Sequence, residues 1–343
     1  MKTLAYSVLI LFIGTLFACT DPPPAPAPTP EPEPSVFVPD FNYDSAYYFV
    51  EQQVNFGPRI PETAEHQQCS EWIRKTLEFY GWQVSFQDAQ IMGFDNRPMN
   101  IRNIIATYNP QHDERVLLCA HWDTRRMADQ DTSRKDEPIL GADDGGSGVG
   151  VLMELARVIS QNPLNAGVEL VFFDAEDQGE NNSPRPSEQT WCLGAQHWSR
   201  NPHPMVVVPR FGVLLDMVGT RGAQFPREGV SVNRAGNIVN IVWQQALELR
   251  YDNIFVDDKD DEIVDDHLFV NDIAGIPTID IINRVPVYTS SGQIIMNRQE
   301  KRPERRFGPH WHTHQDNMTA IDRHTLGAVG EVLLHVLYKE VAG

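Results

Sequence analysis

Cysteine and basic residues are scarce in this 343-residue chain, and both shortages narrow the range of functions. Four cysteines exclude a small domain built on disulfide bonds. The 28 lysine and arginine residues face 47 aspartate and glutamate residues, which gives a formal net charge of −19. Binding to nucleic acid needs clustered positive charge, so we expect no nucleic-acid partner. Hydrophobic residues make up 41% of the chain, which is enough for a folded core and argues against global disorder.

The N-terminal apolar run is too short to span a membrane. Leu4–Phe17 falls short of the about 20 apolar residues that a spanning helix needs. The run ends with Ala18 before Cys19, in a tetrad that resembles a bacterial lipobox. Residues 1–19 are therefore predicted to be a lipoprotein signal peptide, cleaved before Cys19, whose thiol then carries a lipid. An ordinary secretory signal with a chance cysteine is the alternative.

A proline-rich stretch separates this start from the remainder of the chain. Thr20–Pro34 reads TDPPPAPAPTPEPEP, and proline fixes φ and removes a backbone donor. Residues 20–40 are therefore predicted to be an extended tether, and residues 41–343 a single catalytic domain. We expect an exported protein whose lipid holds it to a bacterial membrane, on the periplasmic face.

Apolar runs alternate with helical patterns along the predicted domain. Strands buried on both faces are expected at Val116–Ala120, Val168–Phe173, Phe211–Leu215 and Ile276–Ile282. Helices are expected at Pro61–Tyr80, Gly148–Ile159 and from the N-cap Asp322 to about Tyr338. This alternation predicts an α/β three-layer sandwich, in which helices flank a mixed, largely parallel, twisted central sheet.

Polar residues follow three of the predicted strands directly. His121 and Asp123 follow the first strand, Asp177 lies beyond the second, and Asp216 follows the third. Ligands of open α/β sheets bind beyond the carboxyl ends of the strands, so we expect these side chains to meet at one edge. Each aspartate taken alone is more typical of a turn or a helix cap than of a site.

Further candidates come from two segments outside the strands. Asp144 and the histidines of residues 310–314 complete a set of nitrogen and oxygen donors that suits Zn²⁺. Asp143 or Asp144 is also a possible cap of the helix that follows. Glu176 lies next to Asp177, so one carboxylate can hold a metal while the other acts as a base.

Three segments have structural interpretations. If residues 310–314 are extended, their three histidines share one face, and His310 and His314 are then expected to lie outside the ligand set. The acidic stretch Val256–Glu262 is expected to be a solvated loop rather than a calcium site. The basic stretch Val285–Arg306 is either a loop near the mouth of a pocket or a plain surface insertion.

Apart from Cys19 the cysteines number three, so at least one of them is expected to be a free thiol.

Five ordered motifs together resemble the zinc-dependent M28 aminopeptidase-like fold, and within it the glutaminyl-peptide cyclotransferases (glutaminyl cyclases). The motifs are His121-Trp-Asp123, Gly141-Ala-Asp-Asp144-Gly, Phe172-Phe-Asp-Ala-Glu176-Asp177, Leu214-Leu-Asp216-Met and Trp311-His312-Thr. The resemblance begins near residue 56 and extends to the final helix. Each motif is weak alone, but the ordered set is specific.

The resemblance implies one zinc per chain, with Asp144, Asp177 and His312 as its ligands. It implies that Glu176 is the general acid and base. It also implies a cis peptide bond between Asp144 and Gly145.

The resemblance also implies residues around the substrate. Asp216 and Asp266 match a hydrogen-bonded carboxylate pair beside the substrate, and Trp311 matches an aromatic wall. Trp191 aligns loosely as a second wall. His121 is expected to support the site without binding the metal.

The implied activity converts the N-terminal glutamine of peptides or proteins into pyroglutamate and releases ammonia. Zinc polarises the side-chain amide carbonyl, and Glu176 moves a proton from the α-amine to the departing ammonia. The attacking amine and the attacked carbon belong to one residue, which gives a high effective molarity.

Two other functions stay open. In dinuclear aminopeptidases of this fold, a second zinc binds at the positions of His121 and Asp216, and Asp144 bridges the two metals. Asp177 in place of the usual glutamate and Trp311 directly before the histidine favour the cyclase. A binding lipoprotein without turnover is the third possibility, although binding alone would not require the base.

Overall fold

The computed structural model describes residues 36–181, 185–297 and 299–342. The predicted signal peptide, Cys19 and the proline-rich run lie outside the described residues. The chain from Val36 onward forms one compact unit.

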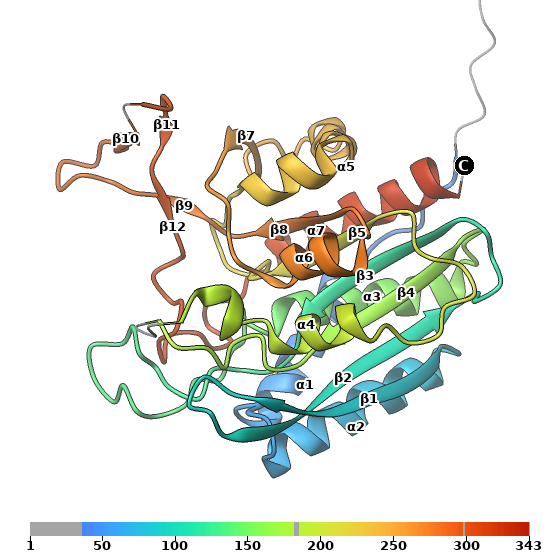
Figure 1. Ribbon diagram of the computed structural model, residues 1–343. Helices are drawn as coiled ribbons and strands as arrows, with labels where there is room; N and C mark the ends of the chain where they lie inside the picture. Colours follow the sequence, from blue (N-terminus) through green and yellow to red (C-terminus); the bar gives the residue numbers. More distant parts are fainter. Residues whose placement is uncertain (1–35, 182–184, 298, 343) are drawn as a thin grey trace, which may run out of the picture. The chain divides into compact units, whose positions relative to one another are not determined.

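A six-stranded mixed sheet runs through the centre of this unit (Figure 1). In spatial order its strands are β1 (Gln83–Met92), β2 (Pro98–Tyr108), β4 (Gly167–Phe173), β3 (Arg115–His121), β5 (Gly212–Asp216) and β8 (Thr278–Ile282). Strands β4, β3, β5 and β8 are parallel to one another, whereas β2 pairs antiparallel with both β1 and β4. The predicted fold class is confirmed.

The parallel strands are buried on both faces because apolar side chains alternate between two cores. In β3, Val116 and Leu118 belong to the larger core, whereas Leu117 and Cys119 belong to the smaller one. This alternation follows from the two-residue period of a strand. The polar residues His121 and Asp216 are the last residues of β3 and β5.

Helices cover both faces of the sheet (Figure 1). They are α1 (Tyr43–Phe56), α2 (Ala64–Phe79), α3 (Ser147–Gln161), α4 (Leu193–Arg200), α5 (Gly229–Glu248), α6 (Asp266–Phe269) and α7 (Arg323–His335). Helix α3 packs on β3 and β5, next to α1 and α7, while α4 contacts β1 and β2 and α6 contacts β5 and β8. Thr63 caps α2, so this helix begins later than predicted, and Asp322 caps α7 as predicted.

The remaining elements are short. They are η1 (Ser187–Gln189), η2 (Val270–Ala274), η3 (Val336–Val341), β6 (Phe225–Arg227), β7 (Phe255–Lys259), β9 (Val285–Pro286), β10 (Met296–Asn297), β11 (Arg302–Pro303) and β12 (Arg305–Arg306). Figure 1 shows β9 to β12 in an arm that projects from the body.

The acidic stretch is not the solvated loop that we expected, because it binds the basic segment. Its first part is strand β7, which pairs with β6. Arg302 Nη1 lies 3.3 Å from Asp260 Oδ1, and Arg305 Nη2 lies 2.6 Å from Asp258 Oδ2. Opposite charges therefore fasten the base of the arm to the body.

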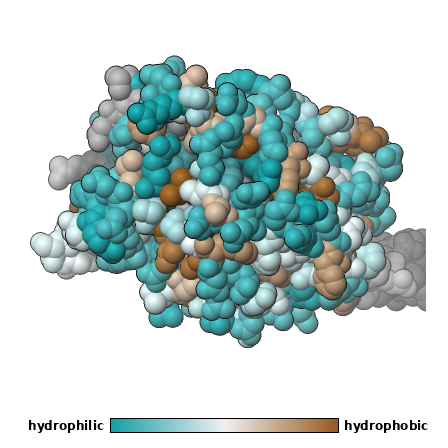
Figure 2. Space-filling model, turned by 90° about the horizontal axis from the view of Figure 1, so that it is seen from below, coloured by the Kyte–Doolittle hydropathy of each residue, from teal (hydrophilic) through white to brown (hydrophobic). Residues whose placement is uncertain are grey.

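The face of the molecule that Figure 2 shows is mostly hydrophilic. The face in Figure 2 shows small scattered hydrophobic patches among polar residues. Among the described residues, no helix has the length and apolar character to cross a membrane. Cys69, Cys119 and Cys192 are all buried free thiols, which confirms the expectation of an unpaired cysteine.

Glu228 fastens the start of α5 to the segment that leads into α6. Its buried carboxylate accepts hydrogen bonds from the amides of Val230, Ser231 and Ile263, and from His267 Nε2. Burial would raise the pKa of Glu228, but the hydrogen bonds from His267 and Ser231 lower it to about 2. A carboxylate with this many donors is stabilising only while it is ionised.

Glu228→Gln is expected to lower the free energy of unfolding by about 2–4 kcal/mol at neutral pH, because the amide nitrogen would face donors. The folded-state pKa of about 2 lies below the roughly 4.3 of an unfolded glutamate. The carboxylate therefore stabilises the fold above about pH 4.3, and this contribution is lost as the pH falls towards about 2. Urea unfolding at several pH values measures the difference in unfolding free energy between the parent protein and the variant. This difference should become smaller as the pH falls. Exposed Glu262→Gln is the control, and a difference that does not change with pH would contradict this account.

Candidate active site

The site lies beyond the carboxyl ends of β3, β4 and β5, where the sequence predicted it. A cavity of about 320 Å³ opens there. Asp144, Glu176, Asp177, Asp216, Trp191, Trp311 and His312 all line it. The structure thus brings together nearly all of the predicted site residues.

Asp144, Asp177 and His312 converge on one point. Their ligand atoms lie within 4.8 Å of one another, and all three residues are buried. His312 Nε2 lies 3.0 Å from Asp177 Oδ1 and 3.8 Å from Asp144 Oδ2. One nitrogen and two carboxylate groups are a donor set that suits a divalent metal such as zinc.

The hydrogen bonding of these residues also fits a metal. Among the described residues, Asp144 Oδ2 and both carboxylate oxygens of Asp177 are buried without a hydrogen-bond donor. Buried polar atoms are nearly always satisfied, and an unpaired buried carboxylate is costly. A cation held between these oxygens and His312 would remove that cost.

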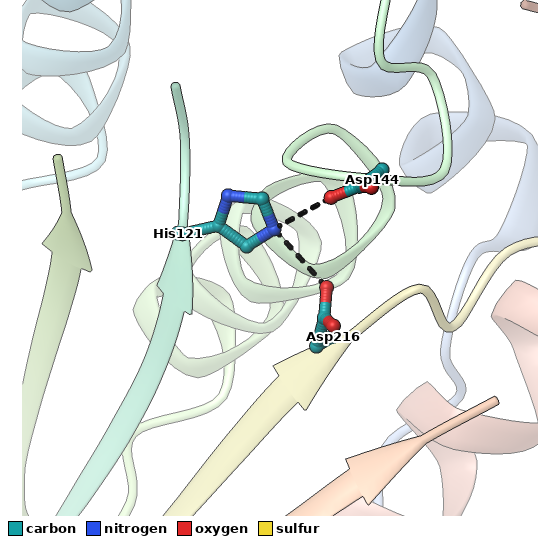
Figure 3. A group of neighbouring side chains, drawn as sticks. All are labelled: His121, Asp144 and Asp216. Atoms are coloured by element: carbon teal, nitrogen blue, oxygen red, sulfur yellow. Dashed lines mark hydrogen bonds and ion pairs between the residues drawn. The ribbon is translucent and has the colours of Figure 1, made fainter. Parts of the chain in front are cut away.

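His121 lies between Asp144 and Asp216, beside the first cluster (Figure 3). Its Nε2 is 3.1 Å from Asp144 Oδ1 and 3.1 Å from Asp216 Oδ1. Burial alone would lower the pKa of His121, but contacts with Asp123, Asp144 and Asp216 raise it well above its usual value. The ligand atoms of His121, Asp144 and Asp216 also lie within 4.8 Å of one another. In the aminopeptidase alternative, these residues would hold the second metal.

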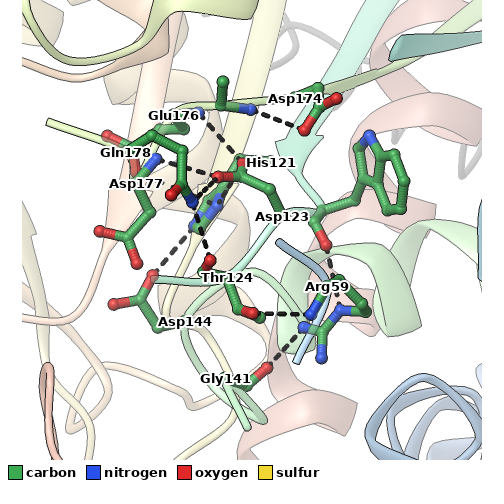
Figure 4. Close-up of polar contacts among 12 residues, drawn as sticks. Arg59, His121, Asp123, Thr124, Gly141, Asp144, Asp174, Glu176, Asp177 and Gln178 are labelled. Atoms are coloured by element: carbon green, nitrogen blue, oxygen red, sulfur yellow. Dashed lines mark hydrogen bonds and ion pairs between the residues drawn. The ribbon is translucent and has the colours of Figure 1, made fainter. Parts of the chain in front are cut away.

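Asp123 fixes the backbone that carries Glu176 and Asp177 (Figure 4). Its carboxylate accepts from the amides of Glu176 and Asp177, at 3.0 and 3.2 Å, and from Gln178 Nε2 at 2.9 Å. The turn after β4 is thus tied to the turn after β3. This tie fixes Glu176 and Asp177 relative to the end of β3.

Arg59 is a fully buried cation that ties the Asp144 loop to the β3 end (Figure 4). Its guanidinium donates to the carbonyls of Trp122, Leu140 and Gly141 at 2.7–3.0 Å. Its amide also donates to Thr124 Oγ1 at 2.8 Å. Arg59 therefore satisfies backbone carbonyls that lie just before Asp144.

Neither Asp143 nor Asp144 caps α3, so the capping prediction is wrong. Gly146 is the N-cap and makes no side-chain cap. Asp143 Oδ1 instead accepts from the amide of Gly219, and Asp316 accepts from the amides of Asp143 and Asp144. Both aspartates are thus used in tertiary contacts, which outweigh the local capping preference.

The bond between Asp144 and Gly145 is trans, in contrast to the expectation from the resemblance. Gly145 has φ +85°, and a Cβ there would collide with the Asp123 carbonyl oxygen. Only glycine accepts this dihedral together with such a close approach. The chain reverses after the ligand through this glycine.

Glu176 and Asp216 have raised pKa values at the cavity wall. Burial raises the pKa of Glu176 well above its usual value, and Asp177 and Asp265 add to the effect. Burial also raises the pKa of Asp216 to about 8, with opposition from His121. A raised pKa makes a carboxyl group a better proton acceptor when it is ionised.

Asp265, rather than the predicted Asp266, faces the cavity. Asp265 is the N-cap of α6 and Asp266 is its first residue, so their side chains leave the chain in different directions. The ligand atoms of Asp265, Glu176 and Cys192 lie within 4.8 Å of one another. Asp266 is fully buried and has no hydrogen-bond donor among the described residues. The carboxylate that the structure places beside Glu176 is that of Asp265.

Stacked side chains form one wall of the cavity, which we call the aromatic column: Trp191, His312, Trp311 and Phe307. Successive ring centroids are 5.9, 3.8 and 4.5 Å apart. Arg125 lies 4.7 Å over Trp191, and Arg284 lies 4.5 Å over Phe307. Both tryptophans line the cavity as expected, and they hold the imidazole of His312 between them.

The other two histidines of residues 310–314 lie outside the metal cluster, as expected. The segment is a turn rather than a strand, and His312 has φ +53°. His310 Nε2 is hydrogen bonded to Asp143 Oδ2 at 2.8 Å, and His314 Nδ1 to Asp131 at 2.9 Å. The three rings therefore do not share one face.

Several residues that shape the site have no local signal in the sequence. Asp129 Oδ1 lies 3.0 Å from His312 Nδ1, and Arg125 Nε donates to the same carboxylate at 2.8 Å. Asp316 reaches back to Asp143, 173 residues away. Such roles arise only when the chain folds, so spacing along the sequence cannot indicate them.

Comparisons with known proteins agree with this geometry. Residues 103–337 match peptidase family M28. The crystal structure of Bacteroides thetaiotaomicron glutaminyl cyclase bound to N-acetylhistamine is 44% identical, with a TM-score of 0.80 over 88% of this chain and 99% of that chain. A Zn-dependent exopeptidase from Parabacteroides distasonis is 42% identical, with a TM-score of 0.79 over 88% of this chain and 100% of that chain.

A curated relative matches over a shorter stretch. The glutaminyl-peptide cyclotransferase of Drosophila melanogaster is 31% identical over 179 residues, which are 49% of this chain and 46% of that protein. The chain thus matches less than half the length of this relative. Together these similarities confirm the family resemblance that the motifs indicated.

Asp129→Asn is expected to weaken the binding of added zinc by 10- to 100-fold, because His312 would lose the carboxylate that orients its ring. Competition with a chromophoric chelator measures the dissociation constant. Asp131→Asn is the matched control, since Asp131 contacts His314 and not a predicted ligand. Equal zinc affinity in both variants and the parent protein would remove Asp129 from this role.

Proposed function

Because the chain belongs to peptidase family M28, we propose that it is a glutaminyl-peptide cyclotransferase. This acyltransferase converts the N-terminal glutamine of peptides or proteins into pyroglutamate and releases ammonia. The solved cyclase that shares 44% of its residues across 88% of the chain supports the proposal. The observation that carries it is a free Glu176 beside three convergent metal ligands, within a cavity walled by tryptophan.

We propose one zinc ion per chain, held by Asp144, Asp177 and His312. Support comes from the buried oxygens of the two aspartates, which have no donor among the described residues. When bound, zinc would supply the Lewis acidity that polarises the side-chain amide carbonyl of the substrate. His121 supports the site by contacting Asp144 and Asp216.

Glu176 moves the proton during cyclisation. It takes a proton from the α-amine while the amine nitrogen bonds to the side-chain carbonyl carbon of the same glutamine. It then gives that proton to the amide nitrogen as the carbon–nitrogen bond breaks and ammonia leaves. The raised pKa of Glu176, which burial causes, suits both halves of this transfer.

The other residues position the substrate for this step. Asp216 and Asp265 line the cavity near Glu176 and orient the amine or the departing ammonia, with Asp266 behind them. Trp191 and Trp311 form walls that keep water from the reacting carbon. Ring closure needs no external nucleophile, so excluding water favours cyclisation over hydrolysis.

A zinc aminopeptidase is the second candidate, because His121, Asp144 and Asp216 form a second possible metal cluster. Incubation of the protein with Gln-Ala-Ala-amide separates the candidates. A cyclase releases ammonia and leaves a blocked N-terminus, an aminopeptidase releases free glutamine, and a binding protein releases neither. Elemental analysis of active protein adds a second test, since two equivalents of zinc required for turnover would favour the aminopeptidase.

Glu176→Gln is expected to reduce turnover by 10²- to 10⁴-fold, because the amide cannot carry the proton between the two nitrogens. Zinc content and thermal unfolding should stay close to those of the parent protein. Ammonia release in a coupled assay measures the loss. Exposed Glu188→Gln serves as a control with the same chemical change, and near-normal turnover in the Glu176 variant would remove this residue from the mechanism.

We also propose that the chain is exported and anchored by a lipid on Cys19. Support comes from the tetrad that ends at Cys19 and from the proline-rich run that follows it. Cys19→Ala is expected to abolish incorporation of labelled fatty acid and to release the protein from the membrane fraction. Labelling of the Ala variant at the level of the parent protein would refute the anchor.

A further inference from the structure

Arg284 follows the end of β8, at the end of the aromatic column away from His312. Its guanidinium lies 4.5 Å over the ring of Phe307, and both residues line the cavity. His312 is 1% exposed, whereas the side chain of Arg284 is 12% exposed. The column therefore runs from the buried metal ligands towards the rim, and Arg284 marks the outer end.

Two contacts fix the guanidinium and leave one nitrogen free. Nε donates to Asp260 Oδ2 at 2.9 Å, and an Nη2 donates to the carbonyl of Arg305 at 3.2 Å. Nη1 has no partner among the described residues. A donor that is held in place and left unpaired at a cavity wall is preorganised for a ligand acceptor.

The charge of Arg284 is already matched. Asp260 is buried and lies 2.9 Å from Arg284, and it also lies 3.3 Å from Arg302. Arg302 in turn contacts Asp261 and Glu300. Because this cluster already pairs its charges, the free Nη1 suits a neutral acceptor better than a carboxylate.

A bound substrate would bring such an acceptor to this place. The α-amine and the side-chain amide of the first residue must reach Glu176 and the metal ligands at the inner end of the cavity. The remainder of the peptide must leave towards the rim. The first carbonyl beyond the glutamine itself is that of the second residue.

We infer that Arg284 forms a subsite that donates a hydrogen bond from Nη1 to the main-chain carbonyl of the residue after the N-terminal glutamine. This inference rests on the proposed cyclase function. The subsite selects extended peptides over glutamine derivatives that lack a second residue. The subsite contacts only the main chain, so binding there does not depend on the side chain of the second residue.

Arg284→Met and Arg302→Met form a matched pair for the test. Methionine keeps an unbranched stem against Phe307 and removes the donors. Arg302 belongs to the same ion-pair cluster but does not line the cavity. Three substrates are compared by ammonia release: Gln-Ala-Ala-amide, Gln-Glu-Ala-amide and glutaminyl-β-naphthylamide, which has no carbonyl beyond the glutamine.

Arg284→Met is expected to raise KM roughly tenfold for both peptides, with little change in kcat, because a charge-assisted hydrogen bond is lost. KM for the naphthylamide should change less than about twofold. Arg302→Met should leave all three values close to those of the parent protein, and thermal unfolding checks that both variants fold.

The remaining outcomes overturn the inference in distinguishable ways. If Arg284→Met raised KM equally for the naphthylamide and the peptides, Arg284 would be a structural residue. The same conclusion would follow if Arg284→Met and Arg302→Met raised KM equally. A loss confined to Gln-Glu-Ala-amide would assign it to an acidic side chain instead. A parent protein that releases no ammonia from any of the three substrates would refute the proposed function, and the subsite with it.

Discussion

Several buried carboxylates lie close together beyond the carboxyl ends of β3, β4 and β5. The site depends on one constraint, which is that each of these negative charges needs a hydrogen-bond donor or a cation. A buried carboxylate without a partner is destabilising by several kcal/mol. Backbone amides satisfy Asp123 and Asp316, and the amide of Gly219 together with His310 satisfies Asp143. The buried oxygens without a donor among the described residues belong to Asp144 and Asp177 beside His312, and to Asp265, Asp266 and Asp280. The metal that we propose would compensate the oxygens of Asp144 and Asp177.

The same constraint explains why the loops around the site are tied to each other rather than to the solvent. Arg59 satisfies the carbonyls before Asp144, and Asp123 satisfies the amides of Glu176 and Asp177. Each tie joins segments that follow different strands. The positions of base and ligands thus depend on the register of the parallel strands, which is fixed by the alternation of apolar residues between the two cores.

The sequence was sufficient to predict the parts of the fold that are buried on both faces. Strands β3, β4, β5 and β8 are mostly apolar runs, whereas β1, which was missed together with β2, is partly exposed and rich in polar residues. The motifs also indicated the residues that the structure gathers in the cavity. Asp129 and Arg59 were not assigned roles, since their importance comes from contacts across long stretches of chain. Asp265 and Asp266 are adjacent in sequence, so only the start of α6 shows which one faces the cavity.

The arrangement of Asp144 bears directly on the choice between cyclisation and hydrolysis. One of its oxygens lies 3.1 Å from His121 Nε2, and the other points at His312 and Asp177 without a donor. His121 Nε2 also lies 3.1 Å from Asp216 Oδ1, and these three residues form the second possible metal cluster. Hydrolysis requires a positioned water, for which a second metal is one solution. Cyclisation requires only that the amine, the amide carbon and a proton carrier meet. We propose that the cluster of Asp144, Asp177 and His312, with Glu176 beside it, meets that simpler requirement.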